Sequence, residues 1–253
     1  MRNEFKIIKN KEEILRYIEQ IKLDRFNFEG QKKIKSSKVA IIGLGGLGCT
    51  AALYIVASGL GEITLIDYDT VMLSNLSRQI LHHDIDINRS KVYSAAEDLS
   101  KINPHCIINV VNDKLEKDNI LEIIRRQTVI IDCSDNITTR EQINYLCSVF
   151  KIPLVFGAAI RMEGYLSTFN WLPDNPCFRC ISRFFNHIDY NCIGQGIMSP
   201  IVGVIGAMQS LEALKLLTNY GNQFTSSLLI YDGFNLEFNQ IKINKDNNCT
   251  VCN

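Results

Sequence analysis

The feature that most constrains this sequence is an apolar stretch ending in a cluster of glycines, KVAIIGLGGLG at residues 38–48. Gly43, Gly45 and Gly48 match the pattern G-x-G-x-x-G, in which a strand turns tightly into a helix and the backbone approaches a phosphate. The helix predicted to follow would direct free N–H groups and the positive end of its dipole at an anion. The sequence therefore predicts a nucleotide at this glycine turn, which also includes Gly46.

An acidic residue stands where such a nucleotide site needs one. Asp67 ends the next apolar run, EITLIDYD, about twenty residues beyond the turn, where a carboxylate can accept hydrogen bonds from ribose hydroxyls. Glycine-rich turns also serve packing alone, so the assignment depends on strand, helix and acid occurring together. These residues do not decide between ATP and a dinucleotide such as NAD.

The composition favours a globular protein and gives no global sign of a polyanionic partner. Lysine plus arginine and aspartate plus glutamate each number 27 in 253 residues, so neither nucleic acid nor a membrane is expected as a partner. The charged N-terminal residues contain no apolar segment typical of a secretory signal. Nine cysteines in such a chain indicate a reducing, cytoplasmic location, with thiols that are buried, metal-bound or reactive.

Strand-like and helical patterns alternate as far as residue 157, which predicts a Rossmann-like, mostly parallel, doubly wound α/β sheet. Ligands of such sheets bind at the carboxyl ends of the strands, so Asp135 is expected to face the same crevice as the glycine turn. The later segments MEGYLSTFNWL, SSLLIYDG and LEFNQIKI predict antiparallel strands that continue the sheet. The apolar segment 198–217 contains charges and is predicted to be a buried helix with Ser199 as its N-cap. Gly203 and Gly206 are expected to serve close packing of that helix.

Two C-x-x-C motifs predict a metal site. Cys177 and Cys180 form one motif, and Cys249 and Cys252 form the other. Four thiolates suit tetrahedral Zn²⁺ and leave no open position for water or substrate, so a structural site is expected. Disulfides or redox-active pairs are the alternative, but a redox motif would normally begin a helix in a thioredoxin-like pattern.

The motifs taken together resemble one enzyme family. GLGGLG, LIDYDTVMLSNLSRQ, SKV, DCSDN, GAAIRMEG, PCFRC and CTVC are similar, in this order and at these intervals, to the MoeB/ThiF adenylyltransferases, bacterial relatives of the ubiquitin-activating enzymes. The resemblance covers Arg16 to Cys252. It implies ATP-dependent adenylylation of the C-terminal glycine of a ubiquitin-like sulfur-carrier protein. The segments AAIRMEG and PCFRCISR look closer to the molybdopterin-synthase branch, which serves molybdenum cofactor biosynthesis, than to the thiamine branch.

The resemblance implies one ThiF/MoeB-like domain over residues 1–253, and no repeat or low-complexity linker interrupts the sequence. Residues 1–30 would form an N-terminal helical segment. Residues 38–157 would form the nucleotide-binding half, and residues 158–253 the half that binds the carrier and zinc.

The resemblance also implies roles for polar residues around the phosphates. Activation of a carboxylate by ATP brings two anions together, so positive groups must surround the phosphates. Besides the glycine turn, the implied nucleotide contacts are Asp67, Asp69, Asn75, Arg78, Gln79, Lys91 and Asp135. Arg78, Lys91 and Asp135 would act in catalysis, with Asp135 holding Mg²⁺. From the residues alone, Arg78 and Lys91 could be surface charges and Asp135 a helix cap.

Cys192 is the other candidate catalytic residue. It lies in DYNCIGQG, where thiamine-branch relatives carry a cysteine that can bond covalently to the carrier. A free thiol without a role is the alternative. Cys49, Cys106, Cys133 and Cys147 are predicted to be small buried side chains.

One position departs from the family's pattern. The family typically reads Arg-Tyr-x-Arg-Gln near its N-terminus, where the second arginine reaches the ATP phosphates of the neighbouring subunit, but Glu19 stands in its place here. A carboxylate about 4 Å from a phosphate costs a few kcal/mol at an effective dielectric near 20. Either Arg16 or Arg25 substitutes for the missing cation, or the helix turns elsewhere, or adenylylation is slow.

By resemblance we expect a homodimer in which each subunit takes one ATP, one zinc and one carrier, with a sulfurtransferase or a cysteine desulfurase as a further candidate partner. Three alternatives remain. The same reaction could serve the thiamine carrier. The glycine turn and Asp67 alone would equally suit an NAD-dependent oxidoreductase. A non-catalytic, zinc-stabilised scaffold would agree with Glu19.

Overall fold

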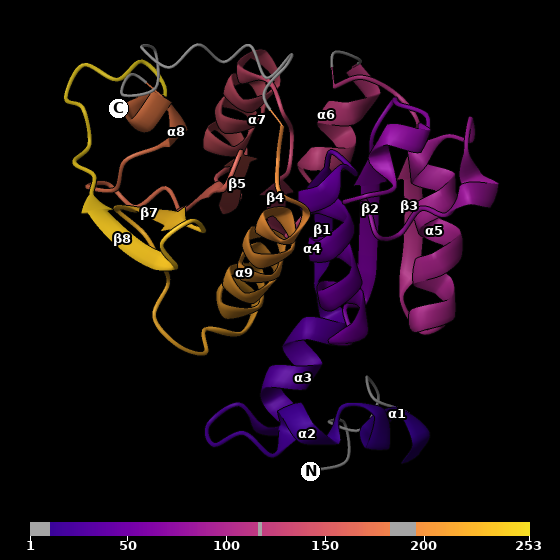
Figure 1. Cartoon of the computed structure of the whole chain (residues 1–253). Coiled ribbons are helices and arrows are strands. Elements are labelled where there is room, and N and C mark those ends of the chain that lie inside the picture. The colour runs from indigo at the N-terminus through magenta and orange to yellow at the C-terminus, as the bar shows by residue number, and fades with distance from the viewer. Residues whose placement is uncertain (1–10, 116–117, 183–195) are drawn as a thin grey trace.

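The structure, a computed structural model, describes residues 11–115, 118–182 and 196–253 (Figure 1). Within these segments the strands form one eight-stranded sheet in the order β3-β2-β1-β4-β5-β6-β7-β8. The strands are β1 (Lys38–Ile42), β2 (Glu62–Ile66), β3 (Ile107–Val111), β4 (Val129–Asp132), β5 (Leu154–Ile160), β6 (Glu163–Phe169), β7 (Ser227–Asp232) and β8 (Glu237–Lys242). The strands from β3 to β5 pair in parallel, and β6, β7 and β8 continue the sheet antiparallel. The predicted fold class is confirmed.

Helices cover both faces of the parallel strands. The α-helices of the described residues are α1 (Lys11–Arg16), α2 (Ile18–Ile21), α3 (Asn27–Ser36), α4 (Gly46–Ala57), α5 (Lys91–Ile102), α6 (Asp118–Ile124), α7 (Ile137–Phe150), α8 (Phe178–Ser182) and α9 (Ser199–Thr218), of which α1 and α2 lie below the sheet (Figure 1). One apolar core joins the sheet to α3, α4, α5 and α9, and a second joins it to α6, α7 and α8. Side chains alternate between faces along a strand, so Val39 and Ile41 enter the first core whereas Ala40 and Ile42 enter the second. A doubly wound sheet is buried in this way on both sides.

Two helix boundaries differ from the prediction. Residues 11–22 show the spacing of one amphipathic helix, but the chain forms α1 and α2 with a break at Tyr17. Tyr17 is buried, and its hydroxyl accepts a hydrogen bond from Asn103 Nδ2 at 2.8 Å. In α9 the N-cap is Met198, so the prediction of Ser199 is wrong by one residue, and the first turn contains Pro200.

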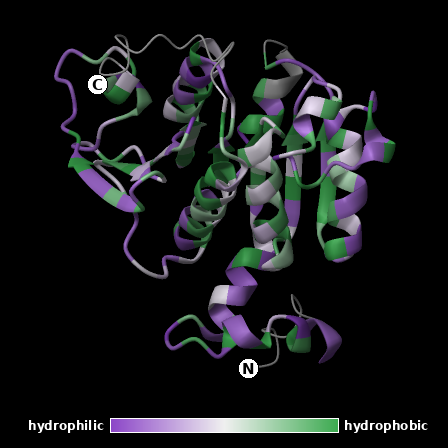
Figure 2. Ribbon diagram, in the orientation of Figure 1, coloured by the Kyte–Doolittle hydropathy of each residue, from purple (hydrophilic) through white to green (hydrophobic). Residues whose placement is uncertain are grey.

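Helix α9 is the apolar helix at the centre of the fold. It is long and apolar enough to cross a membrane by length and composition alone, yet 56% of its most apolar window is buried inside the protein. It packs against α4, and Figure 2 shows hydrophobic and near-neutral colours over most of both helices, with hydrophilic segments on α9. A Cβ on Gly206 would lie 2.6 Å from the Leu47 carbonyl oxygen, so Gly206 permits this packing. A Cβ on Gly203 would meet no atom of the described residues within 4 Å, so Gly203 serves no close packing among them.

Candidate active site

A cavity of about 660 Å³ opens at the carboxyl ends of the parallel strands. Ligands of doubly wound folds bind at this end, and ligand pockets occupy roughly 300–1,000 Å³. The cavity is lined by residues that the sequence assigns to the nucleotide: Gly43, Gly45, Gly46, Asp67, Asp69, Asn75, Arg78, Gln79, Lys91 and Asp135. Widely separated segments therefore converge on one space. Gly48 packs beneath the turn instead, and Cys192 lies outside the described residues.

The glycine turn requires glycine for distinct steric reasons. Gly43 has a φ of +91°, and a Cβ there would lie 2.7 Å from the Cys133 carbonyl oxygen. A Cβ on Gly48 would lie 1.9 Å from the Gly43 carbonyl oxygen. At Gly45 a Cβ would approach no atom of the described residues more closely than Gln79 Nε2 at 3.9 Å. This open side of the turn and the first N–H groups of α4 form a cradle that fits an anion.

Two carboxylates and a lysine form the polar wall beside the turn. Asp67 accepts the Leu44 N–H at Oδ2 (2.6 Å) and the Asp69 N–H at Oδ1 (2.8 Å). These bonds fix the carboxylate and leave a lone pair on each oxygen for a ribose hydroxyl. Lys91, the first residue of α5, is buried and pairs its Nζ with Asp69 Oδ2 at 2.8 Å. A buried charge requires a partner of opposite sign, so Asp69 explains how a lysine is held at the edge of the cavity.

Gln79 gives an independent sign that the cavity takes a polar ligand. Its side chain is 3% exposed, and its Oε1 has no hydrogen-bond partner among the residues that the structure describes. An unsatisfied buried oxygen costs about 1–3 kcal/mol, which a donor on a bound molecule would offset. Nearby, Asn75 Oδ1 accepts the Met72 N–H at 3.1 Å, and Arg78 Nη1 donates to the Ser74 carbonyl at 3.0 Å.

Asp135 lines the cavity because its neighbour caps the next helix. The N-cap of α7 is Asn136, whose Oδ1 accepts the Thr139 N–H at 2.9 Å. The alternative that Asp135 is itself the cap is therefore wrong. Carboxylate and phosphate oxygens are the ligands that Mg²⁺ prefers, so Asp135 and an ATP phosphate fit this ion.

Sequence reasoning missed a buried arginine beneath the Asp135 turn. Arg140 donates from Nε and Nη2 to the Ser134 carbonyl, at 3.2 and 2.6 Å, and its guanidinium lies 5.0 Å from the centre of the Phe156 ring. Burial raises the pKa of Asp132, and the charge of Arg140 opposes that rise. Arg140 thus braces the end of β4. Its sequence signal, an arginine in a predicted helix, is also typical of a surface residue.

The four predicted zinc ligands meet at the far end of the sheet. The Sγ atoms of Cys177, Cys180, Cys249 and Cys252 all lie within 4.8 Å of one another. The Cys177–Cys249 and Cys180–Cys252 sulfur pairs are each 3.6 Å apart, too far for disulfides. Sulfurs about 3.8 Å apart are what a tetrahedral ion with bonds of about 2.3 Å requires, so this donor set fits zinc.

Helix α7 connects the thiol cluster to the cavity. Asn144 donates from Nδ2 to Cys177 Sγ at 3.6 Å and accepts the Phe178 N–H at 3.0 Å. The same helix begins beside Asp135. Cys49, Cys106, Cys133 and Cys147 are buried elsewhere, as predicted.

Comparison with known proteins identifies the family. The sequence pattern of the ThiF family matches residues 17–251. The chain is 43% identical over 241 residues to the molybdopterin-synthase adenylyltransferase of Salmonella typhimurium, covering 95% of this chain and 97% of that protein. The enzyme of the same name from Escherichia coli is 44% identical over 241 residues, with the same coverage. The adenylyltransferase and sulfurtransferase MOCS3 of Drosophila virilis is 41% identical over 246 residues, covering 96% of this chain and 54% of that protein.

Solved structures agree on the fold. PaaA gives a TM-score of 0.81 at 23% identity, covering 97% of this chain and 78% of that chain. Escherichia coli MccB with ATP gives a TM-score of 0.78 at 20% identity, covering 89% of this chain and 69% of that chain. At such identities the likeness concerns architecture alone, whereas the sequence matches extend over nearly the whole chain. The sequence matches show that the chain belongs to the ThiF family.

Proposed function

We propose that this chain is an adenylyltransferase of the molybdopterin-synthase type, which joins AMP from ATP to the C-terminal glycine of a ubiquitin-like sulfur carrier. One observation supports the proposal above the others: the glycine turn, Asp67, Arg78, Lys91 and Asp135 line a single cavity. The full-length relatives named as molybdopterin-synthase adenylyltransferases supply the substrate class.

The reaction needs positioned charge more than proton transfer. A carboxylate oxygen of the carrier attacks the α-phosphorus, the bond from that phosphorus to the bridging oxygen breaks, and pyrophosphate leaves with the electron pair. No proton moves in this step. No histidine is among the described residues that line the cavity, which agrees with catalysis by electrostatic stabilisation.

The chain's own groups would divide this work. Asp67 holds the ribose, and the glycine turn donates N–H groups to the phosphates. Lys91 and Arg78 place positive charge where pyrophosphate departs. Mg²⁺, held by Asp135 and phosphate oxygens, would neutralise part of the triphosphate charge.

The other end of the cavity is apolar and suits a narrow protein tail. It is lined by Phe156, Ala158 and Ile160 of β5, together with Tyr165 of β6 and Ile197. A tail that ends in glycine has no bulky side chain to exclude it. We place the carrier's C-terminal tail along this β5–β6 side, with its carboxylate toward the glycine turn.

We also propose a cytoplasmic, zinc-stabilised enzyme that receives sulfur for the carrier from a sulfurtransferase or a cysteine desulfurase. Zinc at the four cysteines would fix the C-terminal residues to α8 and α7. A covalent role for Cys192 stays a prediction, which a Cys192→Ser variant in a sulfur-transfer assay would test.

The experiment that tests the function is ATP–pyrophosphate exchange with molybdopterin-type and thiamine-type carriers side by side. We expect faster exchange with the molybdopterin-type carrier. Faster exchange with the thiamine-type carrier would move the chain to the other branch, and background exchange with both would favour a scaffold. Calorimetry with ATP·Mg²⁺ and with NAD distinguishes the adenylyltransferase from an NAD-dependent oxidoreductase. Tight binding of NAD without binding of ATP would support the oxidoreductase.

A homodimer is proposed from the outer face of α9. Val204, Ala207, Met208 and Leu211 recur there at helical spacing; Val204 and Met208 are partly buried against the chain's own core, whereas Leu211 is 57% exposed. A helix that is apolar all round is expected to be covered all round, so a second copy of the chain would cover this stripe.

Leu211→Glu is therefore expected to convert the dimer to a monomer in sedimentation analysis, because it places a charge in the covered face. Leu236→Glu, at a leucine that is 74% exposed in the β7–β8 connection, is the control and should stay dimeric. A wild-type monomer, or a Leu211→Glu dimer, would contradict the placement.

The position of Glu19 leads to a separate prediction. Glu19 lies on α2, its side chain is 81% exposed, and it pairs with Lys22 at 2.6 Å. Helix α2 lies near the start of β1, at the opposite end of the strands from the glycine turn (Figure 1), so Glu19 cannot act on its own subunit's cavity.

Glu19→Arg is expected to raise the rate of carrier-dependent pyrophosphate exchange several-fold, because a cation replaces a carboxylate near the neighbouring subunit's phosphates. Glu12→Arg on α1 is the matched charge-reversal control and should leave the rate unchanged. An unchanged or lower rate for Glu19→Arg would count against this placement.

A further inference from the structure

His82 is a buried histidine that contacts three parts of the nucleotide site but does not line the cavity. Its Nε2 lies 3.3 Å from the carbonyl oxygen of Leu44, inside the glycine turn. Its Nδ1 lies 2.8 Å from Ser94 Oγ on α5, and Nε2 is also 3.7 Å from Cys49 Sγ on α4. The imidazole therefore bridges the turn and the two helices that flank it.

Leu44 is held at both of its backbone polar groups, the N–H and the carbonyl. Its N–H donates to Asp67 Oδ2 at 2.6 Å, and its carbonyl faces His82 Nε2 at 3.3 Å and Cys49 Sγ at 3.4 Å. A thiol is a weak donor compared with an imidazole N–H. The position of the turn thus depends on Asp67 at one end of this residue and on His82 at the other.

The other ring nitrogen of His82, Nδ1, contacts α5, the helix that begins with Lys91. Ser94 lies three residues after Lys91 on α5, and residues at this spacing share one face of a helix. The backbone N–H of His82 donates to the Gln79 carbonyl at 3.0 Å. One residue therefore links the glycine turn, the segment 75–79 and α5, which are the three segments placed around the phosphates.

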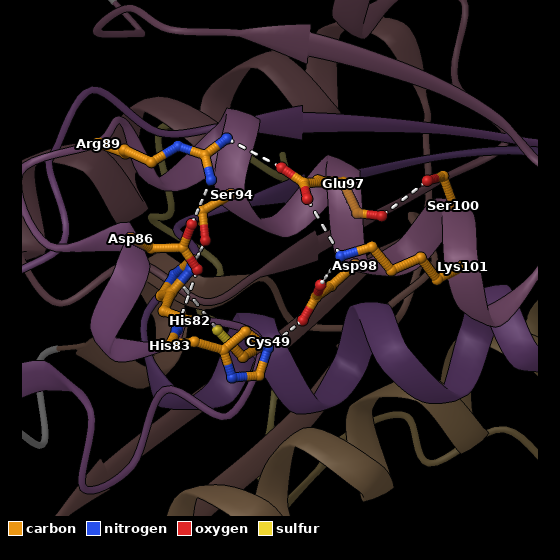
Figure 3. Close-up of polar contacts among 10 residues, drawn as sticks. All are labelled: Cys49, His82, His83, Asp86, Arg89, Ser94, Glu97, Asp98, Ser100 and Lys101. Atoms are coloured by element: carbon orange, nitrogen blue, oxygen red, sulfur yellow. Dashed lines mark hydrogen bonds and ion pairs between the residues drawn. The ribbon is translucent and has the colours of Figure 1, made fainter.

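The partners of the imidazole define its tautomer. The Leu44 carbonyl can only accept, so Nε2 carries the proton, and Nδ1 then accepts from the Ser94 hydroxyl. The carboxylate of Asp86 lies beside that hydroxyl; it receives the backbone N–H of His83 at 3.0 Å and pairs with Arg89 (Figure 3). Asp86 is therefore still bound by His83 and Arg89 when the Ser94 hydroxyl donates to Nδ1 of His82.

We propose that His82 is a positioning residue, which holds the glycine turn against α5 so that the turn's N–H groups and Lys91 keep the spacing that a triphosphate needs. The inference rests on the proposed ATP site. It predicts that loss of the Leu44 contact weakens binding of the phosphates and leaves binding of the nucleoside unchanged, because Asp67 remains in place.

The test compares two variants of His82 whose side-chain amides each replace one ring nitrogen: Asn replaces Nδ1, and Gln replaces Nε2. His82→Asn keeps an amide near Ser94 but does not reach Leu44, whereas His82→Gln reaches Leu44. By calorimetry with the full-length protein, we expect His82→Asn to weaken ATP·Mg²⁺ binding about five- to tenfold and to leave adenosine binding within about twofold. His82→Gln is expected to restore ATP·Mg²⁺ binding to within about threefold of wild type. His83→Gln, at the exposed neighbour that pairs with Asp98, is the control and should bind like wild type.

Ser94→Ala provides a second variant should His82→Asn fail to fold. It removes the α5 side of the link and is expected to weaken ATP·Mg²⁺ binding about threefold, again without effect on adenosine. Wild-type affinity in His82→Asn and Ser94→Ala, or equal losses for ATP and adenosine, would overturn the role of His82. A wild-type protein that does not bind ATP·Mg²⁺ would overturn the proposed function together with this inference, so the two failures differ.

A pH measurement supplies a readout independent of the nucleotide. Burial lowers the pKa of His82, and the nearby Lys91 charge lowers it further, against opposing effects of the Leu44 carbonyl, Asp86 and Asp67. The thiol of Cys49 is neutral there because burial raises its pKa to about 12. The unfolded chain therefore binds a proton more readily, so the stability from neutral His82 is lost as the pH falls below about 6.5. Wild type should lose more thermal stability than His82→Gln between about pH 7 and pH 5.5, and equal losses would contradict a buried, neutral imidazole.

Discussion

Replacement of Lys91 by methionine is expected to lower the rate of carrier-dependent ATP–pyrophosphate exchange by about two to three orders of magnitude. The Lys91 side chain is 7% exposed and pairs with Asp69 at the edge of the cavity. Because the side chain is largely shielded from solvent, water would screen its charge only weakly from the phosphates. Methionine keeps most of the length and apolar contact of the side chain, so the change removes charge more than packing.

Lys101→Met is the matched control for this experiment. Lys101 lies on the same helix, but it is exposed and pairs with Glu97 and Asp98 away from the cavity, at 3.1 and 2.9 Å. Its replacement should leave the exchange rate within about twofold, because surface ion pairs contribute little. Equal rates for wild type and Lys91→Met would show that the cavity does not place this lysine on a phosphate.

Loss of one zinc ligand is expected to cause the largest change in stability. Cys249→Ser should reduce bound zinc from one per chain to a small fraction and lower the melting temperature by about 10 °C. The metal would link residues 177–180 to residues 249–252 and so act as a cross-link that encloses a long segment of chain. A cross-link of this kind stabilises a protein by about 4 kcal/mol. In a protein of this size each kcal/mol shifts the melting temperature by about 2–4 °C. A strong chelator should produce the same shift in wild type.

Cys106→Ala provides the comparison for a buried thiol outside the cluster. Cys106 is 8% exposed and belongs to the core beneath α5. Its loss should cost about 1–2 kcal/mol through a small cavity without any change in zinc content. A Cys249→Ser variant with full zinc, or wild type without zinc after expression in zinc-rich medium, would contradict the metal site.

Much of the fold can be predicted from the sequence because parallel strands buried on both faces are continuous apolar runs. β1, β2 and β4 are such runs, and short polar turns separate them from helices. Helix α3 could not be predicted in this way. Its sequence, NFEGQKKIKS, has little apolar periodicity, and it is held by specific contacts such as Gln31 Nε2 to the Ser58 carbonyl at 2.9 Å.

The candidate site shows the same division between local and distant effects. The glycines, Asp67 and the two C-x-x-C motifs follow from local spacing, because each motif needs its residues at fixed intervals. The bracing of the Asp135 turn by Arg140 could not be predicted, since it depends on how α7 packs against the end of β4. The bridge made by His82 likewise joins residues far apart in the chain.

The central claim is that one cavity holds ATP and a carrier tail so that the tail becomes an acyl-adenylate. Mass spectrometry of the carrier after incubation with this protein and ATP·Mg²⁺ tests it most directly. The account predicts a carrier heavier by one adenylyl group, formed by wild type and strongly reduced with Lys91→Met. A carrier of unchanged mass with wild type, under conditions in which ATP binds and the carrier's C-terminal glycine is intact, would contradict it.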